Sequence, residues 1–106
     1  MELIVYWTQF AEDKLDDIFK YYKLKASLII AQNLTNGIID ATIDLAKNPQ
    51  IGQKELLLSE RFQEFRYLVY KNYKIIYWVN ADKHRIEIIN VFDTRQNPAK
   101  LEQDLQ

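Results

Sequence analysis

The fold is decided by the stretch FRYLVYKNYKIIYWVNADKHRIEIINVFD, which runs from Phe65 to Asp93. Three runs rich in β-branched and aromatic residues alternate here with two short polar links, a pattern typical of β-strands joined by turns. Because both links are too short for the crossover that parallel strands need, neighbouring strands must be antiparallel. The predicted strands of this meander are Glu64–Tyr70, Tyr73–Val79 and Arg85–Asp93.

The segment before the meander predicts one strand and two helices. A β-branched and aromatic run predicts a strand at Glu2–Trp7, and Thr8 is a suitable N-cap for a helix at Gln9–Lys23. Apolar residues at steps of three and four predict a second helix at Ala26–Lys47, which ends before Pro49. The two helices should form a hairpin with one continuous apolar side.

Two shorter elements complete the predicted order. Leu56–Leu58 is predicted as a short extended piece, and Asn97-Pro98 should open a short C-terminal helix. The fold class is therefore α+β: an N-terminal strand, an α-helical hairpin, a three-stranded antiparallel meander and a short C-terminal helix. With 106 residues, the chain is expected to form a single domain over residues 1–106. The helices should cover one sheet face and leave the other free, and its large side chains indicate a partner.

The composition excludes several classes of function. A formal net charge of −1 argues against a protein that coats nucleic acid, and the absence of cysteine excludes disulfides and thiol chemistry. No apolar run approaches the roughly 20 residues that span a bilayer, so we expect a cytoplasmic protein without a membrane partner. The single histidine, His84, lies in a polar turn, and no cluster has metal-ligand spacing. We therefore expect no metal and no cofactor.

The candidate functional residues are cations and aromatic residues of the meander. Arginine and lysine can hold phosphate or carboxylate groups, and aromatic rings can stack on a base or pack on a protein. The alternative is ordinary salt bridging to Glu64, Glu87 or Asp93, which we favour for Lys74. The residues expected to contact a partner outside the chain are Arg66, Tyr67, Lys74, Trp78, Arg95 and Gln96.

The turn at Lys71-Asn72 predicts on which face these side chains lie. If that turn has two residues, Tyr70 pairs with Tyr73, and Arg66 shares a face with the side chains of Ile75 and Tyr77. Lys74 then lies on the opposite face, with Tyr67, Val69, Ile76 and Trp78. A bulge would change this assignment, and Arg66 and Lys74 need not act together.

Arg95 lies at the joint between the last strand and the C-terminal helix, in NVFDTRQNP (Asn90–Pro98). An arginine at a strand end can reach past the sheet, and Asp93 can hold it by a charged hydrogen bond. Gln96 and Asn97 add polar groups, and Pro98 fixes the exit of the chain. We predict two roles for Arg95: it ties this corner together and it contacts a partner.

Several of these motifs in this order resemble the RelE/ParE superfamily of toxins from bacterial type II toxin–antitoxin modules, also called plasmid stabilisation proteins. The resemblance covers nearly the whole chain. It rests on the capped first helix, the "Y-K-I-I-Y" core of the middle strand and the closing "VFDTRQNP". The motifs are VYWTQFAEDKLDDIFKYY, LAKNPQIG, FRYLVYKNYKIIYWV and VFDTRQNP.

The resemblance implies one of two activities. ParE-type toxins poison DNA gyrase without being nucleases, whereas RelE-type toxins cut mRNA on the ribosome without a metal. Lys74 stands where the RelE type carries a catalytic arginine, and Arg95 or Thr94 lies near a second one. In a nuclease, the resemblance implies Lys74 and Arg95 as the catalytic residues. Two RelE lysines of the preceding strand fall near Phe65 and Tyr67 here, and the later proton-transfer residue has no counterpart. The chain is therefore closer to the ParE type.

The resemblance also implies the partners. We expect a gyrase inhibitor that is not an enzyme and that a cognate antitoxin neutralises through a partly acidic, disordered segment. The alternatives are a metal-independent endoribonuclease that acts on ribosome and mRNA, and a toxin-fold protein that only binds its antitoxin.

Overall fold

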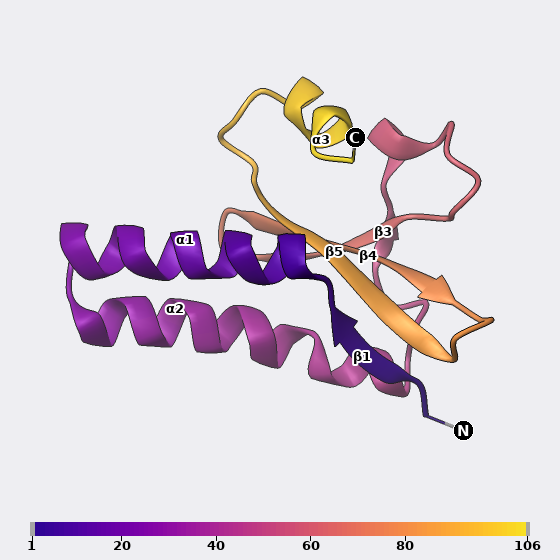
Figure 1. Cartoon of the computed structure of the whole chain (residues 1–106), viewed down its shortest axis with the longest axis horizontal. Helices are drawn as coiled ribbons and strands as arrows, with labels where there is room; N and C mark the ends of the chain where they lie inside the picture. Colours follow the sequence, from indigo (N-terminus) through magenta and orange to yellow (C-terminus); the bar gives the residue numbers. More distant parts are fainter. Residues whose placement is uncertain (1, 106) are drawn as a thin grey trace.

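The computed structural model describes residues 2–105, and its elements follow the predicted order with local differences (Figure 1). The helices are α1 (Gln9–Lys25), α2 (Leu28–Ala41) and α3 (Ala99–Gln103), and the short 3-10 helices are η1 (Ile43–Ala46) and η2 (Leu56–Leu58). The strands are β1 (Ile4–Trp7), β2 (Gln53–Lys54), β3 (Arg66–Tyr70), β4 (Tyr73–Asn80) and β5 (Arg85–Asp93). The predicted α+β class is confirmed.

The strands form one sheet in the order β1-β5-β4-β3-β2. The meander of β3, β4 and β5 is antiparallel, as its short links require. β1 lies beside β5 and parallel to it, which the sequence pattern did not predict. A parallel pair is possible here because a long connection, including the helical hairpin, separates the two strands.

Hydroxyl side chains fix the ends of the helical hairpin. The Thr8 Oγ1 accepts a hydrogen bond from the Ala11 amide at 3.3 Å, and Ser27 Oγ accepts one from the Ile30 amide at 3.1 Å. The predicted second helix, Ala26–Lys47, is wrong at both ends. It begins after the Ser27 cap and gives way to a 3-10 turn at Thr42, whose hydroxyl donates to the Ile39 carbonyl at 2.7 Å.

The main core lies between the helical hairpin and one face of the sheet. The helices contribute one stripe of apolar side chains, and the meander contributes every second residue. Each large side chain buried in this way stabilises the fold by roughly 1.5–3 kcal/mol. The buried members of the main core are Ala11, Leu34, Ile38, Leu45, Tyr73, Ile75, Tyr77, Ile86, Ile88 and Val91.

The prediction that the opposite sheet face is free is wrong, because a second, smaller core covers it. Its buried members are Leu58, Phe65, Ile76, Phe92 and Leu101. Figure 1 shows α3 beside the loop that carries η2, and these two segments close over this face. Leu56–Leu58 is also not extended, because Glu55 caps it by accepting a hydrogen bond from the Leu57 amide at 3.1 Å.

A β-bulge in β5 sets which residues face each core. Ile76 pairs with Asn90 but Tyr77 pairs with Ile88, so Ile89 is the extra residue. Because of this shift, Ile88 and Val91 both face the helical hairpin although they are three positions apart. The turn pairs Tyr70 with Tyr73 as predicted, so the faces expected for β3 and β4 are confirmed.

Candidate functional site

Arg66 ties the loop before β2 to the sheet. Its Nη1 donates to the Gly52 carbonyl at 2.8 Å, and only 15% of its side chain is exposed. The neighbouring Tyr77 hydroxyl accepts a hydrogen bond from the Gly52 amide and donates one to the Pro49 carbonyl, both at 2.9 Å. Arg66 and Tyr77 therefore hold the same loop from adjacent strands.

Lys74 forms an ion pair on the other sheet face. Its Nζ lies 2.8 Å from the Glu55 carboxylate, of which only 3% is exposed, and 4.3 Å from the centre of the Tyr67 ring. Tyr67 in turn donates to Gln53 at 3.0 Å. The salt bridging favoured for Lys74 is present, but its partner is Glu55, 19 residues earlier in the chain, and not one of the strand carboxylates named from the sequence.

Trp78 lies on the same face as Lys74 and packs against the second core. It pairs with Glu87 across the bulged part of the sheet. Its side chain is half-buried, so one part of the indole remains available to a partner.

Arg95 forms the tie to Asp93 that its position predicts. Its Nε and Nη2 donate to the two Asp93 oxygens at 3.0 and 2.8 Å, and its amide donates to Oδ1 at 2.9 Å. These bonds, above all those of the guanidinium, lower the pKa of the Asp93 carboxyl to about 2. Even so, 63% of the Arg95 side chain is exposed, and Gln96 beside it is exposed too.

A hollow of about 410 Å³ opens beside Arg95, between α1 and the end of the sheet. Tyr22 and Tyr73 lie in its wall, and burial followed by a hydrogen bond with Tyr22 raises the pKa of the Tyr73 hydroxyl. Lys14 and Asp17 lie on the α1 side of the hollow. The hollow thus combines phenol groups with charges of both signs, a surface suited to a polar protein contact.

The candidate residues do not meet in one site. Tyr67 and Lys74 are in contact, but Arg66 lies on the opposite face, and Arg95 lies at the end of the sheet. Each of the three cations has an acceptor within the chain at 2.8 Å. Of these cations, Arg95 alone has more than half of its side chain exposed, so it is the one best placed to reach a partner.

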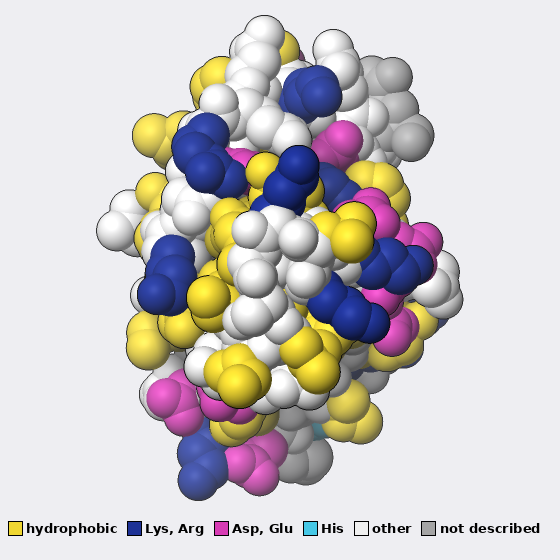
Figure 2. Space-filling model, turned by 90° about the vertical axis from the view of Figure 1, so that its left-hand side faces the viewer, with side chains coloured by type: hydrophobic (Ala, Val, Ile, Leu, Met, Phe, Trp, Pro, Cys, Tyr) yellow, Lys and Arg dark blue, Asp and Glu magenta, His cyan; other side chains and the backbone are white. Residues whose placement is uncertain are grey.

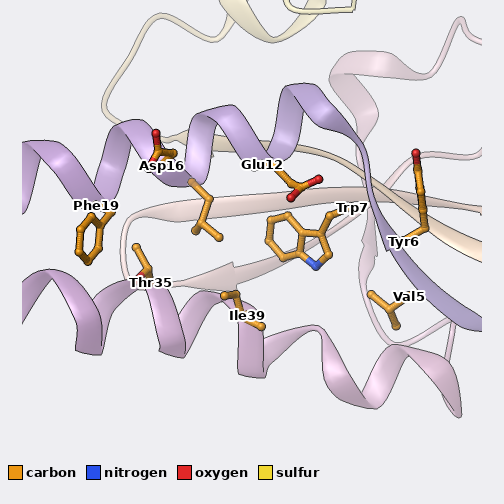
Figure 3. A pocket seen from close by; sticks show the side chains of 9 residues that line it. Val5, Tyr6, Trp7, Glu12, Asp16, Phe19, Thr35 and Ile39 are labelled. Atoms are coloured by element: carbon orange, nitrogen blue, oxygen red, sulfur yellow. The ribbon is translucent and has the colours of Figure 1, made fainter.

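The sequence patterns missed an apolar groove between α1, α2 and β1 (Figure 3). The groove encloses about 580 Å³, and the side chains of Trp7, Leu15, Phe19 and Ile39 line it. These residues come from three elements, so no single periodic stripe marks them. The one available signal was an excess of isoleucines on the second helix beyond the stripe that faces the sheet.

A family model described as the ParE toxin of type II toxin–antitoxin systems, parDE, matches residues 5–98. The chain belongs to the ParE toxin family. It is a ParE-type toxin of a type II toxin–antitoxin system, and the resemblance to the RelE/ParE superfamily, closer to ParE, is confirmed.

A solved structure shares the fold of this ParE-family protein. It is described as the chromosomal ParDE TA system from P. aeruginosa, with a TM-score of 0.72 and 19% sequence identity. The match covers 87% of this chain and 96% of that chain. No curated protein matches the chain.

Among residues 2–105, no group of three His, Cys, Asp or Glu side chains is placed to hold a metal ion. Over the same residues, no helix has the length and apolar character needed to cross a membrane.

Proposed function

We propose that this ParE-type toxin acts by binding DNA gyrase rather than by cutting RNA. The observation that supports this proposal is the environment of Lys74, the residue aligned with a nuclease arginine. Its ammonium group lies against Glu55 and over Tyr67, in a partly buried site next to the second core. A group held in this way cannot approach a phosphate unless a buried carboxylate loses its partner, which is costly.

The contact with gyrase is proposed to include Arg95 and Gln96. Both are exposed, and Asp93 holds the guanidinium in one orientation at the edge of the hollow. A charged group positioned in advance loses less side-chain entropy on binding than a free one. Binding needs no proton transfer, so this site can act without the general acid or base that a nuclease requires.

Two parallel assays test this function. Purified protein is added to a gyrase supercoiling reaction and to a translating extract in which cleavage of mRNA is followed. We expect supercoiling to be inhibited and mRNA to remain intact, since the loss of general acid–base help costs roughly 100-fold to 10,000-fold in cleavage rate. Cleavage that falls when Lys74 or Arg95 is replaced by alanine would instead establish the endoribonuclease. If the protein neither inhibits supercoiling nor causes cleavage of mRNA, the result would support a protein that only binds its antitoxin.

Arg95→Ala tests the proposed contact between Arg95 and gyrase. Lys83→Ala is the control, because it removes the same positive charge elsewhere. Because 63% of the Arg95 side chain is exposed, the loss of its pair with Asp93 should cost at most about 1 kcal/mol of unfolding free energy. Inhibition of gyrase and toxicity in growing cells should fall much further. If toxicity and stability fall to the same degree, Arg95 has a structural role alone.

We also propose that a cognate antitoxin neutralises this toxin by binding it directly. The apolar groove between α1 and α2 supports this proposal, because a groove of this kind can accept one face of an amphipathic helix. Co-expression of the two proteins should give one complex on size-exclusion chromatography at micromolar concentration. Ile39→Glu should weaken that complex, whereas Leu56→Glu, at an exposed position outside the groove, should not. Separate elution of the wild-type proteins contradicts the proposal.

A further inference from the structure

The far end of the helical hairpin exposes an unusual amount of apolar surface. The last turn of α1 and the first turn of α2 extend beyond the sheet, so the two cores do not need these side chains (Figure 1). Leu24 is 85% exposed and Ile29 is 68% exposed, and Leu28 and Ile30 beside them are about half exposed. These four residues, together with Lys23 and Lys25, are called the hairpin end.

The charge of the hairpin end has one sign. Lys23 and Lys25 lie in the last turn of α1, and the sequence has no acidic residue between Asp17 and Asp40. Among residues 2–105, neither lysine has a carboxylate within 4.0 Å, whereas Lys20, one turn earlier, pairs with Asp16 at 2.8 Å. Figure 2 looks onto this end of the molecule and shows basic side chains beside apolar ones.

The ordinary role of such lysines explains only part of this pattern. Lysine near a helix C-terminus interacts favourably with the helix dipole, so the lysines alone need no partner. The dipole gives no reason for the exposed leucines and isoleucines beside these lysines. A contiguous apolar patch bordered by charges of one sign is instead typical of an interaction surface.

A cleft beside the hairpin end adds polar groups at fixed places. It encloses about 340 Å³ between the helices and the β3–β4 turn, and Ile30, Tyr70 and Lys71 line it together with Asn33 and Asn72. Lys71 has a φ of 53°, a left-handed conformation that its turn imposes. The cleft therefore places a third lysine and the Asn33 amide next to the apolar patch, while the Asn72 Nδ2 donates to Asp93 at 3.2 Å.

We propose that the hairpin end is a docking surface for another protein, through a segment that carries leucine-like side chains flanked by carboxylates. The exposed apolar side chains would bury that segment's apolar face, and the lysines would attract its carboxylates. The Asn33 amide of the cleft suits the hydrogen-bonding groups of a peptide, which a lipid surface does not present in fixed positions. A symmetric dimer of this chain would bring lysines against lysines, which is unfavourable. The inference does not depend on gyrase being the target.

A synthetic helix-forming peptide with leucines on one face and glutamates on the other is the probe. The full chain should bind this peptide with micromolar affinity by fluorescence anisotropy. The variant Leu24→Asn/Ile29→Asn should raise Kd about tenfold. A control pair, Leu56→Asn and Lys83→Glu, changes an exposed leucine and an exposed lysine elsewhere and should leave Kd unchanged.

Charge reversal separates specific docking from general stickiness. Lys23→Glu/Lys25→Glu should weaken binding of the glutamate peptide and strengthen binding of a matched peptide with lysines in place of glutamates. Circular dichroism checks that each variant keeps its helices. Equal binding of both peptides by wild-type and reversed chains would overturn the proposal.

Two further measurements test whether a membrane or a second copy of the chain binds the hairpin end instead. Co-sedimentation with phosphatidylglycerol vesicles that is lost in Leu24→Asn/Ile29→Asn would assign the surface to a membrane and overturn the proposal. Self-association of the wild type in analytical ultracentrifugation, lost in the same variant, would assign it to a second copy. Failure of the wild type to bind the peptide would also overturn the proposal.

Discussion

Glu55 shows how a single buried charge constrains this protein. Its carboxylate is buried and accepts hydrogen bonds from the Lys74 ammonium group and from the Leu57 amide. These two bonds link β4 to η2. Replacing Lys74 by Met leaves that charge without its cation. Because Lys74 is about one-fifth exposed, we expect a loss of roughly 2–3 kcal/mol in unfolding free energy, below the value for fully buried pairs.

The matched variant is Lys74→Met/Glu55→Gln, which removes both charges and keeps an acceptor for Leu57. It should recover much of the loss, since no unpaired charge remains buried. Urea denaturation of the single and double variants measures the difference. A double variant as unstable as Lys74→Met would show that the lysine acts through packing, not through its charge.

Asp93 gives a prediction for pH. Its folded pKa, about 2, lies below the ordinary value of 3.8 because Arg95 binds the ionised carboxylate. A lowered folded pKa stabilises the fold above the unfolded value, and this contribution disappears as pH falls from about 4 to about 2. The stability difference between wild type and Arg95→Ala should therefore shrink over that range. A difference that stays constant in urea titrations from pH 5 to pH 2 would contradict this assignment.

The local sequence pattern predicted most helices and strands. The errors lie where the structure depends on backbone redirection or on pairing that the local pattern does not show. The strands of the meander begin and end within two residues of their predicted bounds. The second helix was predicted too long because apolar spacing continues through Ile43 and Leu45, while Thr42 redirects the backbone. The bulge at Ile89 was not predicted, because the adjacent isoleucines Ile88 and Ile89 suit the two apolar faces of the sheet alike.

The candidate site was predictable only where its partners are close in the chain. Arg95 and Asp93 are two residues apart, and their pairing was predicted from a short motif. Glu55 and Lys74 come together only because the loop after β2 folds over the sheet, so their pairing needs the tertiary structure. The groove between α1 and α2 was missed for the same reason.

Gly37 allows α2 to lie close to the sheet. A Cβ at this position would lie 2.1 Å from the Tyr70 hydroxyl oxygen and 2.3 Å from the ring carbon that bears it. Gly37→Ala should therefore lower stability by about 1–3 kcal/mol, although alanine is the better helix former by about 1 kcal/mol.

Removing the obstacle should reverse the sign of that effect. In a Tyr70→Ala background, the ring is gone and the helix propensity of alanine remains. Gly37→Ala should then raise the unfolding free energy relative to Tyr70→Ala alone, as measured by urea denaturation. If it still destabilises the protein by the same amount, the close contact is not the reason for glycine in this helix.

At the scale of the whole molecule, the sheet has two unequal cores. The hairpin covers one face with two long helices, whereas the other face depends on the five-residue α3 and the loop around η2. Arg61 and Glu102 join these two covers at 2.6 Å, and Lys14 joins α1 to Asp104 at 3.2 Å. These pairs are partly exposed and contribute little, so the apolar contacts of α3 must hold the smaller core together.

Leu101 is the test of that dependence, since it is 1% exposed and lies among Ile76, Phe92 and Phe65. Leu101→Ala should lower the unfolding free energy by about 2–4 kcal/mol through lost burial and the cavity left behind. Leu24→Ala, at an exposed position in a helix, is the matched control and should change stability by less than about 0.5 kcal/mol. Because the smaller core depends on α3 and the loop around η2 and not on the long helices, Leu101→Ala should also increase the fluorescence of a dye that binds exposed apolar surface. The helical circular dichroism signal of α1 and α2 should persist. Loss of the helical signal in step with dye binding would show instead that the two cores unfold as one unit.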